Sequence, residues 1–295
     1  SELIIKMKSF IKSALHYCIP SSKTKQAMQK MKNVIMIFLI YTSITATITY
    51  LTNNYNHSFW GNFLINANSS ILDFLVLGVI LYYFEYQRQN KESINELLED
   101  LGNLAKHSPI DLKIQKIKII RQLNNKGVYK IDVPRIDLGD MITIKYLTFV
   151  NSELSGLDMS KSNIRDCSFT DCTIQALNIS HSKISNVKFL RCRIKNIKAT
   201  KSKIDGIVFE DCYLEGGDFS SSEMKSCVLK LCDLKNVKYE NATMRNANII
   251  SARNVNIQRI IEAKDLDYLN CDEEVKFKLT EVKPTIKFSA IGNRG

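Results

Sequence analysis

The sequence has few of the residues on which most catalytic sites depend. Only four histidines occur in 295 residues, and they lie in four separate segments as His16, His57, His107 and His181. The chain contains no glycine-rich phosphate loop, no serine nucleophile elbow and no metal-ligand spacing. We therefore expect a protein that is not an enzyme and that binds no metal or other cofactor.

Acidic residues are in the minority, and the formal net charge is +11. Residues 1–32 contribute much of it, with seven lysines against the single acid Glu2. Apolar residues such as Ile4, Phe10 and Leu15 alternate with these lysines. This basic amphipathic N-terminal segment is typical of a helix lying on an anionic leaflet, and an ordinary packed helix is the alternative.

Charge is absent from a long apolar segment, Val34–Leu51, and nearly absent from a second one, Phe63–Phe84. Each is long enough to cross a bilayer as a helix. Lysine and arginine lie before the first segment and after the second, and none lies between them. The positive-inside rule then predicts a two-helix transmembrane hairpin over residues 33–84, with both termini in the cytoplasm. Because isoleucine, lysine and asparagine are abundant, we expect the cytoplasmic (inner) membrane of a bacterium, or a phage protein placed there.

Both predicted spans contain a stripe of polar residues. An acid in mid-span costs about 2.5–3.5 kcal/mol on insertion scales, so Asp73 requires an explanation. One explanation is that the two stripes satisfy each other within the hairpin or between protomers. Others are a polar lining for an ion path in an oligomer, or a span boundary that leaves Asp73 near the surface. The stripe residues are Asn66, Ser70 and Asp73 in the second span, and Thr42, Thr45 and Thr49 in the first.

A strict five-residue repeat runs from Leu147 to Ala252. Neither a helix nor a strand alone has this period, so the repeat indicates a solenoid whose units bury their apolar positions by stacking. A second column of mostly small residues lies two positions before each large one, from Ser152 onward. The large column reads Phe149, Leu154, Met159, Ile164, Phe169, Ile174, Ile179, Ile184, Phe189, Ile194, Ala199, Ile204, Phe209, Leu214, Phe219, Met224, Leu229, Leu234, Tyr239, Met244 and Ile249.

In both columns, residues twenty positions apart are more alike than residues five positions apart, which predicts four units per turn. Phe149, Phe169, Phe189 and Phe209 form one such series. Volume is also compensated, because Ile197 accompanies Ala199 while one turn later Gly217 accompanies Phe219, as a close-packed interior requires.

The repeat resembles that of the pentapeptide-repeat family, whose units read roughly Ala-(Asp/Asn)-(Leu/Phe)-X-X. Matching units include Cys232-Asp233-Leu234 and Ala247-Asn248-Ile249. The resemblance implies an all-β solenoid, the right-handed quadrilateral β-helix of the family. Some members resemble DNA and bind type II topoisomerases through acidic surfaces. Residues 147–257 hold sixteen Lys/Arg against twelve Asp/Glu, so this topoisomerase-binding DNA mimicry lacks its electrostatic basis here.

The predicted organisation has five parts. Helical caps are expected at both ends of the solenoid, because a terminal rung would otherwise expose unpaired strand edges. After the basic segment (1–32) and the hairpin (33–84) come a helical linker and cap (85–132), the β-helix (133–257), and a helical tail with an extended end (258–295).

Six of the eight cysteines occupy small inward positions: Cys167, Cys172, Cys192, Cys212, Cys227 and Cys232. No histidine shares their columns, and a cytoplasmic compartment disfavours disulfides. We expect buried free thiols that act as small apolar fillers.

One turn of the repeat, residues 183–203, carries only basic charges. They occupy outward positions by the five-residue count, and they either form a solvated band or bind an anionic partner such as an acidic protein, a nucleotide, nucleic acid or lipid headgroups. Interleaved aromatic residues for base stacking are missing, which disfavours sequence-specific nucleic-acid binding. We call these residues the basic band: Lys183, Lys188, Arg191, Arg193, Lys195, Lys198, Lys201 and Lys203.

Two functions are compatible with these features. The first is a protein-interaction or assembly scaffold, in which the cytoplasmic β-helix holds a protein or other anionic partner on an oligomeric membrane anchor. The second is a membrane effector, for example in anti-phage defence, in which the β-helix senses a trigger and the spans depolarise the membrane. In both cases we expect contact with the lipid bilayer and a homo-oligomer.

Overall fold

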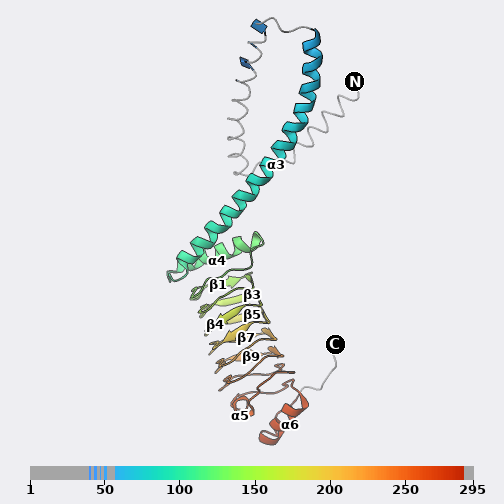
Figure 1. Ribbon diagram of the computed structural model, residues 1–295. Helices are drawn as coiled ribbons and strands as arrows, with labels where there is room; N and C mark the ends of the chain where they lie inside the picture. Colours follow the sequence, from blue (N-terminus) through green and yellow to red (C-terminus); the bar gives the residue numbers. More distant parts are fainter. Residues whose placement is uncertain (1–39, 41–42, 45–46, 48–49, 52–56, 289–295) are drawn as a thin grey trace, which may run out of the picture. The chain divides into compact units, whose positions relative to one another are not determined.

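The computed structural model (Figure 1) describes residues 57–288, together with residues 40, 43, 44, 47, 50 and 51. Contacts divide the chain into two compact units, residues 1–85 and residues 86–295. The predicted basic segment 1–32 and most of the first predicted span lie outside the described residues.

The longest element is helix α3, His57–Leu104. It contains the second predicted span and continues without a break into the charged stretch that follows Glu85. Within the described part of the chain, no helix has the length and apolar character needed to cross a membrane. The two spans therefore stay a prediction.

Helix α4, Ile110–Asn125, covers the first rung of the β-structure. Its buried face includes Ile117, Ile120 and Leu123. The side-chain amide of Asn124 donates to the carbonyl oxygen of Thr148 (2.9 Å), and its oxygen accepts the backbone N–H of the same residue (2.9 Å). Asn124 thus satisfies the strand edge as a further rung would, which is the physical requirement for a cap.

A buried lysine holds α4 to the preceding turn and to the first rung. Lys116 is fully buried, and its ammonium donates to the carbonyl oxygens of Ala105 (3.0 Å), His107 (2.7 Å) and Asp137 (2.7 Å). Burial lowers the pKa of Lys116, and the charge of Asp137 opposes that effect. Three acceptors from two segments therefore converge on one side chain, and this connects the helical region to the coil.

The β-structure consists of short parallel strands that stack on their counterparts twenty residues away. Figure 1 shows the strands as successive layers. The strands are β1 (Thr143–Lys145), β2 (Thr148–Val150), β3 (Asn163–Thr170), β4 (Thr173–Gln175), β5 (Lys183–Leu190), β6 (Arg193–Lys195), β7 (Lys203–Asp205), β8 (Val208–Glu210), β9 (Glu223–Lys225) and β10 (Val228–Lys230).

The twenty-residue register gives the coil four faces. Face 1 contains β1, the first half of β3, the first half of β5, β7 and β9, and face 2 contains β2, the rest of β3 and β5, β8 and β10. Face 3 follows the pairing of Glu153 with Thr173 and of Arg193 with Tyr213. Face 4 follows the pairing of Asp158, Asn178, Lys198 and Asp218. The predicted β-solenoid with four units per turn is confirmed.

Both inward columns form the core of the coil. The large residues are buried without exception, and Ser162, Ser182, Ser202 and Ser222 are buried in the small column. The rings of Phe149, Phe169, Phe189 and Phe209 stack with centroids 4.6–5.1 Å apart and planes within 12°.

The predicted compensation of volume at residues 197–219 is also present. A Cβ at Gly217 would lie 2.9 Å from Cγ2 of Ile197 and 3.3 Å from Cε2 of Phe219. Phe219 therefore occupies the space that a larger residue at position 217 would need.

The C-terminal end of the coil is less helical than the sequence suggests. Helix α5 is short, Ile257–Ile260, and the chain then returns to the coil, where Asp265 pairs with Thr243 and Asn270 with Asn248. Among the described residues after Ile260, a longer helix is formed by α6, Glu273–Val282. These bridges join residues that are 22 positions apart instead of 20, because the chain around α5 contains two extra residues. The five-residue count from the sequence therefore does not detect this last rung.

Candidate functional site: the outer faces of the coil

The outward chemistry of the coil is set by three of the five positions in each unit. In the unit Cys167–Asp171, for example, Cys167 and Phe169 point inward, Ser168 and Thr170 lie on the outer face, and Asp171 forms the corner. The interior is sealed, so the outward positions are where this part of the chain can contact another molecule.

Each corner residue adopts a left-handed backbone conformation. Positive φ angles near 50–60° recur every five residues, for example at Asp166, Asp171 and Asn186, and Gly156, Gly206 and Gly216 take the same place with φ of 65–77°. The corner N–H groups donate to carbonyl oxygens of the next rung, as Asn196 N does to Glu215 O (2.9 Å). This corner column is not among the columns predicted from sequence, although asparagine, aspartate, serine and glycine recur at every fifth position and favour the left-handed conformation.

The structure distributes the basic band around the whole coil. All eight side chains are exposed, as the five-residue count predicts. Lys183 and Lys203 lie on face 1, Lys188 lies on face 2, Arg193 and Lys195 lie on face 3, Lys198 lies on face 4, and Arg191 and Lys201 lie at corners. The band is therefore a ring, not a patch.

Three members of the band are in ion pairs with acids on adjacent rungs. Arg191 binds Asp171 with two contacts, Nε to Oδ1 at 2.7 Å and Nη2 to Oδ2 at 2.8 Å. This hydrogen bonding lowers the pKa of Asp171 and raises that of Arg191. Lys195 lies 3.6 Å from Glu215, and Lys203 lies 3.9 Å from Glu223. Acids on adjacent rungs thus neutralise Arg191, Lys195 and Lys203, whereas among the described residues no ion pair is found for the other members of the band.

The predicted polar stripe is described only in part. Asn66, Ser70 and Asp73 lie on α3 and are exposed. Thr42, Thr45 and Thr49 lie outside the described residues, so the meeting of the two stripes stays a prediction.

The six repeat cysteines are buried free thiols. Burial raises the pKa of Cys227 to about 12 and that of Cys167 to about 11, so both stay protonated near neutral pH. Cys192 Sγ lies 3.3 Å from the carbonyl oxygen of Phe169, and Cys212 Sγ lies 3.3 Å from that of Phe189. Among residues 57–288, no group of three or more His, Cys, Asp or Glu side chains could hold a metal ion.

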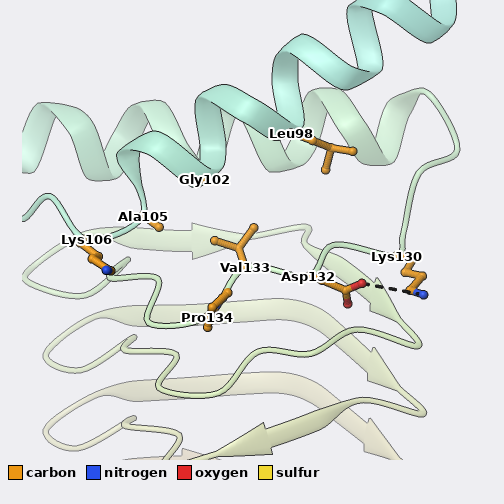
Figure 2. A pocket seen from close by; sticks show the side chains of 8 residues that line it. All are labelled: Leu98, Gly102, Ala105, Lys106, Lys130, Asp132, Val133 and Pro134. Carbon is orange, nitrogen blue, oxygen red and sulfur yellow. Dashed lines mark ion pairs between the residues drawn. The ribbon is translucent and has the colours of Figure 1, made fainter.

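A shallow pocket of 370 Å³ lies where α3 ends above the first rung (Figure 2). Leu98 and Gly102 on α3 face Val133 and Pro134 across it, and Lys130 at one side forms an ion pair with Asp132 (3.8 Å). Ala105 and Lys106 complete the lining. The pocket combines an apolar floor with charged margins.

Residues 142–219 match the family model described as a pentapeptide repeat region. The resemblance of the five-residue pattern to this family is thereby confirmed for residues 142–219. No curated protein matches the chain.

Solved structures similar to this chain include QnrB1 and Rfr23. A trypsin-treated form of QnrB1, described as a plasmid-mediated fluoroquinolone resistance protein, is 13% identical; the match covers 52% of this chain and 97% of that one, with a TM-score of 0.26. Rfr23, a pentapeptide repeat protein from the cyanobacterium Cyanothece 51142, is also 13% identical; the match covers 35% of this chain and 63% of that one, with a TM-score of 0.18.

Proposed function

We propose that this pentapeptide-repeat protein is a non-enzymatic interaction scaffold that holds a partner at the cytoplasmic face of a bacterial inner membrane. The observation that carries this proposal is the separation of the coil into a sealed apolar interior and an outer surface of regularly spaced polar residues. Such a surface is rigid, because each rung is hydrogen-bonded to its neighbours. A rigid, repetitive surface suits binding to an extended partner better than it suits chemistry.

Membrane anchoring is supported by exposed apolar side chains on α3. Large apolar residues on all sides of one stretch of a helix are costly in water and favourable in lipid. Between positions 76 and 84 the exposed large apolar residues are Val76, Leu77, Val79, Ile80, Leu81, Tyr82, Tyr83 and Phe84.

The scaffold is tested by affinity capture from the native host with the full chain in mild detergent. We expect a specific partner that is retained by the wild-type protein and lost when Lys188, Arg193 and Lys198 of the basic band are changed to glutamate. The matched control changes Lys230, Lys235 and Lys238, which are exposed on later rungs. Equal capture by both variants would place the partner elsewhere on the coil, and no reproducible partner at all would contradict the scaffold.

A membrane effector is the second candidate, and Asp73 is the observation that favours it. Its exposed carboxylate lies on α3 only three residues before the exposed apolar stretch begins. A pore built from such helices would place the carboxylate in a polar lining. Expressing the protein while recording membrane potential tests this directly.

For an effector, we expect wild-type protein to depolarise cells and Asp73→Leu to abolish depolarisation, while Val79→Leu on the same helix leaves it unchanged. Unchanged membrane potential under every condition would exclude the effector and leave the scaffold. Membrane association of the wild type, measured by resistance to carbonate extraction, is required by both functions, and its absence would exclude both.

A further inference from the structure

Basic side chains are concentrated on face 1 of the coil and at the corner that precedes it, although these residues are far apart in the sequence. They come from β1, β3, β5 and β7 and from two corner residues, and all but the half-buried Lys145 are exposed. We call these residues the cationic face: Lys145, Lys161, Arg165, Lys183, Lys201 and Lys203.

The parallel register places these cations next to one another. Lys183 pairs with Lys203, and Lys145 pairs with Arg165, so each couple is separated by one rung of about 4.8 Å. Lys161 and Lys201 occupy the same corner column two rungs apart, with His181 between them. Six basic groups thus share one face although they span 59 positions of the chain.

Among the described residues, acids on neighbouring rungs pair with several of the cations elsewhere on the coil and with one of the six on this face. Arg245 pairs with Asp265 and Arg253 with Asp211. On the cationic face, Lys203 alone is in an ion pair among the described residues, with Glu223 at 3.9 Å, and Lys225 shares that carboxylate at 4.0 Å. Like charges one rung apart repel each other, so an external anion would be favoured here.

The composition of the face selects among anions. Five of its six cations are lysines, which act as hydrated point charges, whereas recognition of individual phosphates or carboxylates favours the planar fork of arginine. The outward positions between them on β3 and β5 are the polar residues Asn163 and Ser185, and the exposed Met141 lies one rung before Lys161 in the same corner column. A flat array of lysines, in which Lys145 Nζ lies 5.4 Å from the ring centroid of the exposed Tyr146, matches a diffuse anionic surface.

We propose that the cationic face docks on the anionic headgroups of a lipid bilayer. This inference rests on the proposed membrane anchoring, which would keep the coil close to lipid. Attraction to an anionic leaflet falls by about fivefold in binding constant for each lysine removed, from the usual contribution of one cation near the surface. Removal of three lysines should therefore weaken docking by about a hundredfold, and salt should weaken it in the wild type.

The test uses the full chain in lipid nanodiscs and measures acetylation of individual lysines by mass spectrometry. We expect Lys145 and Lys203 to be protected in discs that contain phosphatidylglycerol, and to react freely in discs of phosphatidylcholine alone or at high salt. The triple variant Lys161→Gln, Lys183→Gln and Lys201→Gln should lose this protection. The matched triple Lys230→Gln, Lys235→Gln and Lys238→Gln, on later rungs of the same coil, should keep it.

Three outcomes would overturn the inference. The first is equal reactivity of Lys145 and Lys203 in neutral and anionic discs, and the second is unchanged protection in the triple variant of the cationic face. The third is protection by added duplex DNA but not by phosphatidylglycerol, which would assign the face to nucleic acid. Retention of the chain in neutral discs is scored separately: if the chain is not retained, membrane anchoring fails, whereas retention without protection refutes docking alone.

Discussion

Each five-residue unit places one residue in the left-handed region of the backbone, at the corner of the coil. Asparagine and glycine adopt this conformation at little cost, whereas an aliphatic residue is strained by about 1–2 kcal/mol. Leu231 is the corner residue with the largest aliphatic side chain, with φ of 61° and a side chain that is 40% exposed. We predict that Leu231→Asn increases the free energy of unfolding by about 1 kcal/mol, measured by chemical denaturation.

The control for this substitution is Leu190→Asn, at the end of a strand on the adjoining face 2. Leu190 ends β5 in an extended conformation and is half-buried, so asparagine there removes apolar contact without relieving strain, and stability should fall. If both substitutions lowered stability, corner strain would not be the determining effect.

Tyr239 shows the cost of a buried polar group in the large column. Its side chain is 2% exposed, its ring lies 6.2 Å from that of Phe219, and its hydroxyl has no hydrogen-bond partner among the described residues. We predict that Tyr239→Phe stabilises the coil by about 1–2 kcal/mol, because it removes an unsatisfied buried hydroxyl. Tyr213→Phe, which is half exposed under Arg253, should change stability little in the same thermal melts.

The pH dependence of the Tyr239 variant gives a second measurement. Burial raises the pKa of Tyr239 above its ordinary value of 10.0. The unfolded chain therefore releases this proton at a lower pH than the folded chain, and the stability of the wild type falls as pH rises above 10.0. The advantage of Tyr239→Phe over the wild type should grow in that range; a constant difference would contradict the burial of a neutral phenol.

At the scale of elements, Lys116 determines how α4 caps the coil. Methionine has a similar volume but cannot donate to the carbonyl oxygens of Ala105, His107 and Asp137. We predict that Lys116→Met lowers the free energy of unfolding by about 3 kcal/mol, since buried acceptors lose their donor. Lys118→Met is the control, because Lys118 is exposed on the same helix. Equal melting temperatures for the two variants would show that the cap does not depend on this contact.

The charge of Lys116 also makes this contribution dependent on pH. Because its pKa is lowered on folding from the ordinary 10.5, the unfolded chain binds more protons just below that pH. The stability of the wild type therefore rises with pH up to 10.5 through this group. The deficit of Lys116→Met should be larger at the alkaline end of that window than at neutral pH.

The columns of the coil and the helical cap at its N-terminal end could be predicted from sequence, whereas the buried lysine of that cap and the cationic face could not. Phe149 and Phe169 repeat because burial constrains their size, and the count of five reveals them. Lys116 looks like a solvent-facing residue by composition, and only the carbonyl groups around it make its burial favourable. Lys145 and Lys203 are 58 positions apart, and they share a face because of the strand register over four rungs. Both are outward positions, and the apolar pattern of the sequence does not identify them.

At the scale of the whole molecule, oligomeric state separates the two proposed functions. We expect a homo-oligomer for both functions, but only the effector depends on it. A polar path through lipid requires several two-span hairpins, whereas the binding surface of the scaffold lies within one coil. For the effector, we predict that light scattering of the full chain in detergent gives a protein mass of several multiples of 33.8 kDa. Polar groups between helices in a membrane contribute about 1 kcal/mol each to association, so changing Asn66, Ser70 and Asp73 together to leucine should shift the mass toward one chain.

The control for the mass measurement changes Val76 and Val79 to leucine, which keeps α3 apolar and should leave the oligomer intact. A wild-type mass of one chain would exclude a pore made of hairpins, because two helices cannot enclose a polar path. The scaffold would survive that result, since its binding surface lies within one coil. An oligomer that persists in the polar triple variant would instead place the contacts between copies outside this stripe, and Asp73 would then need a role other than association.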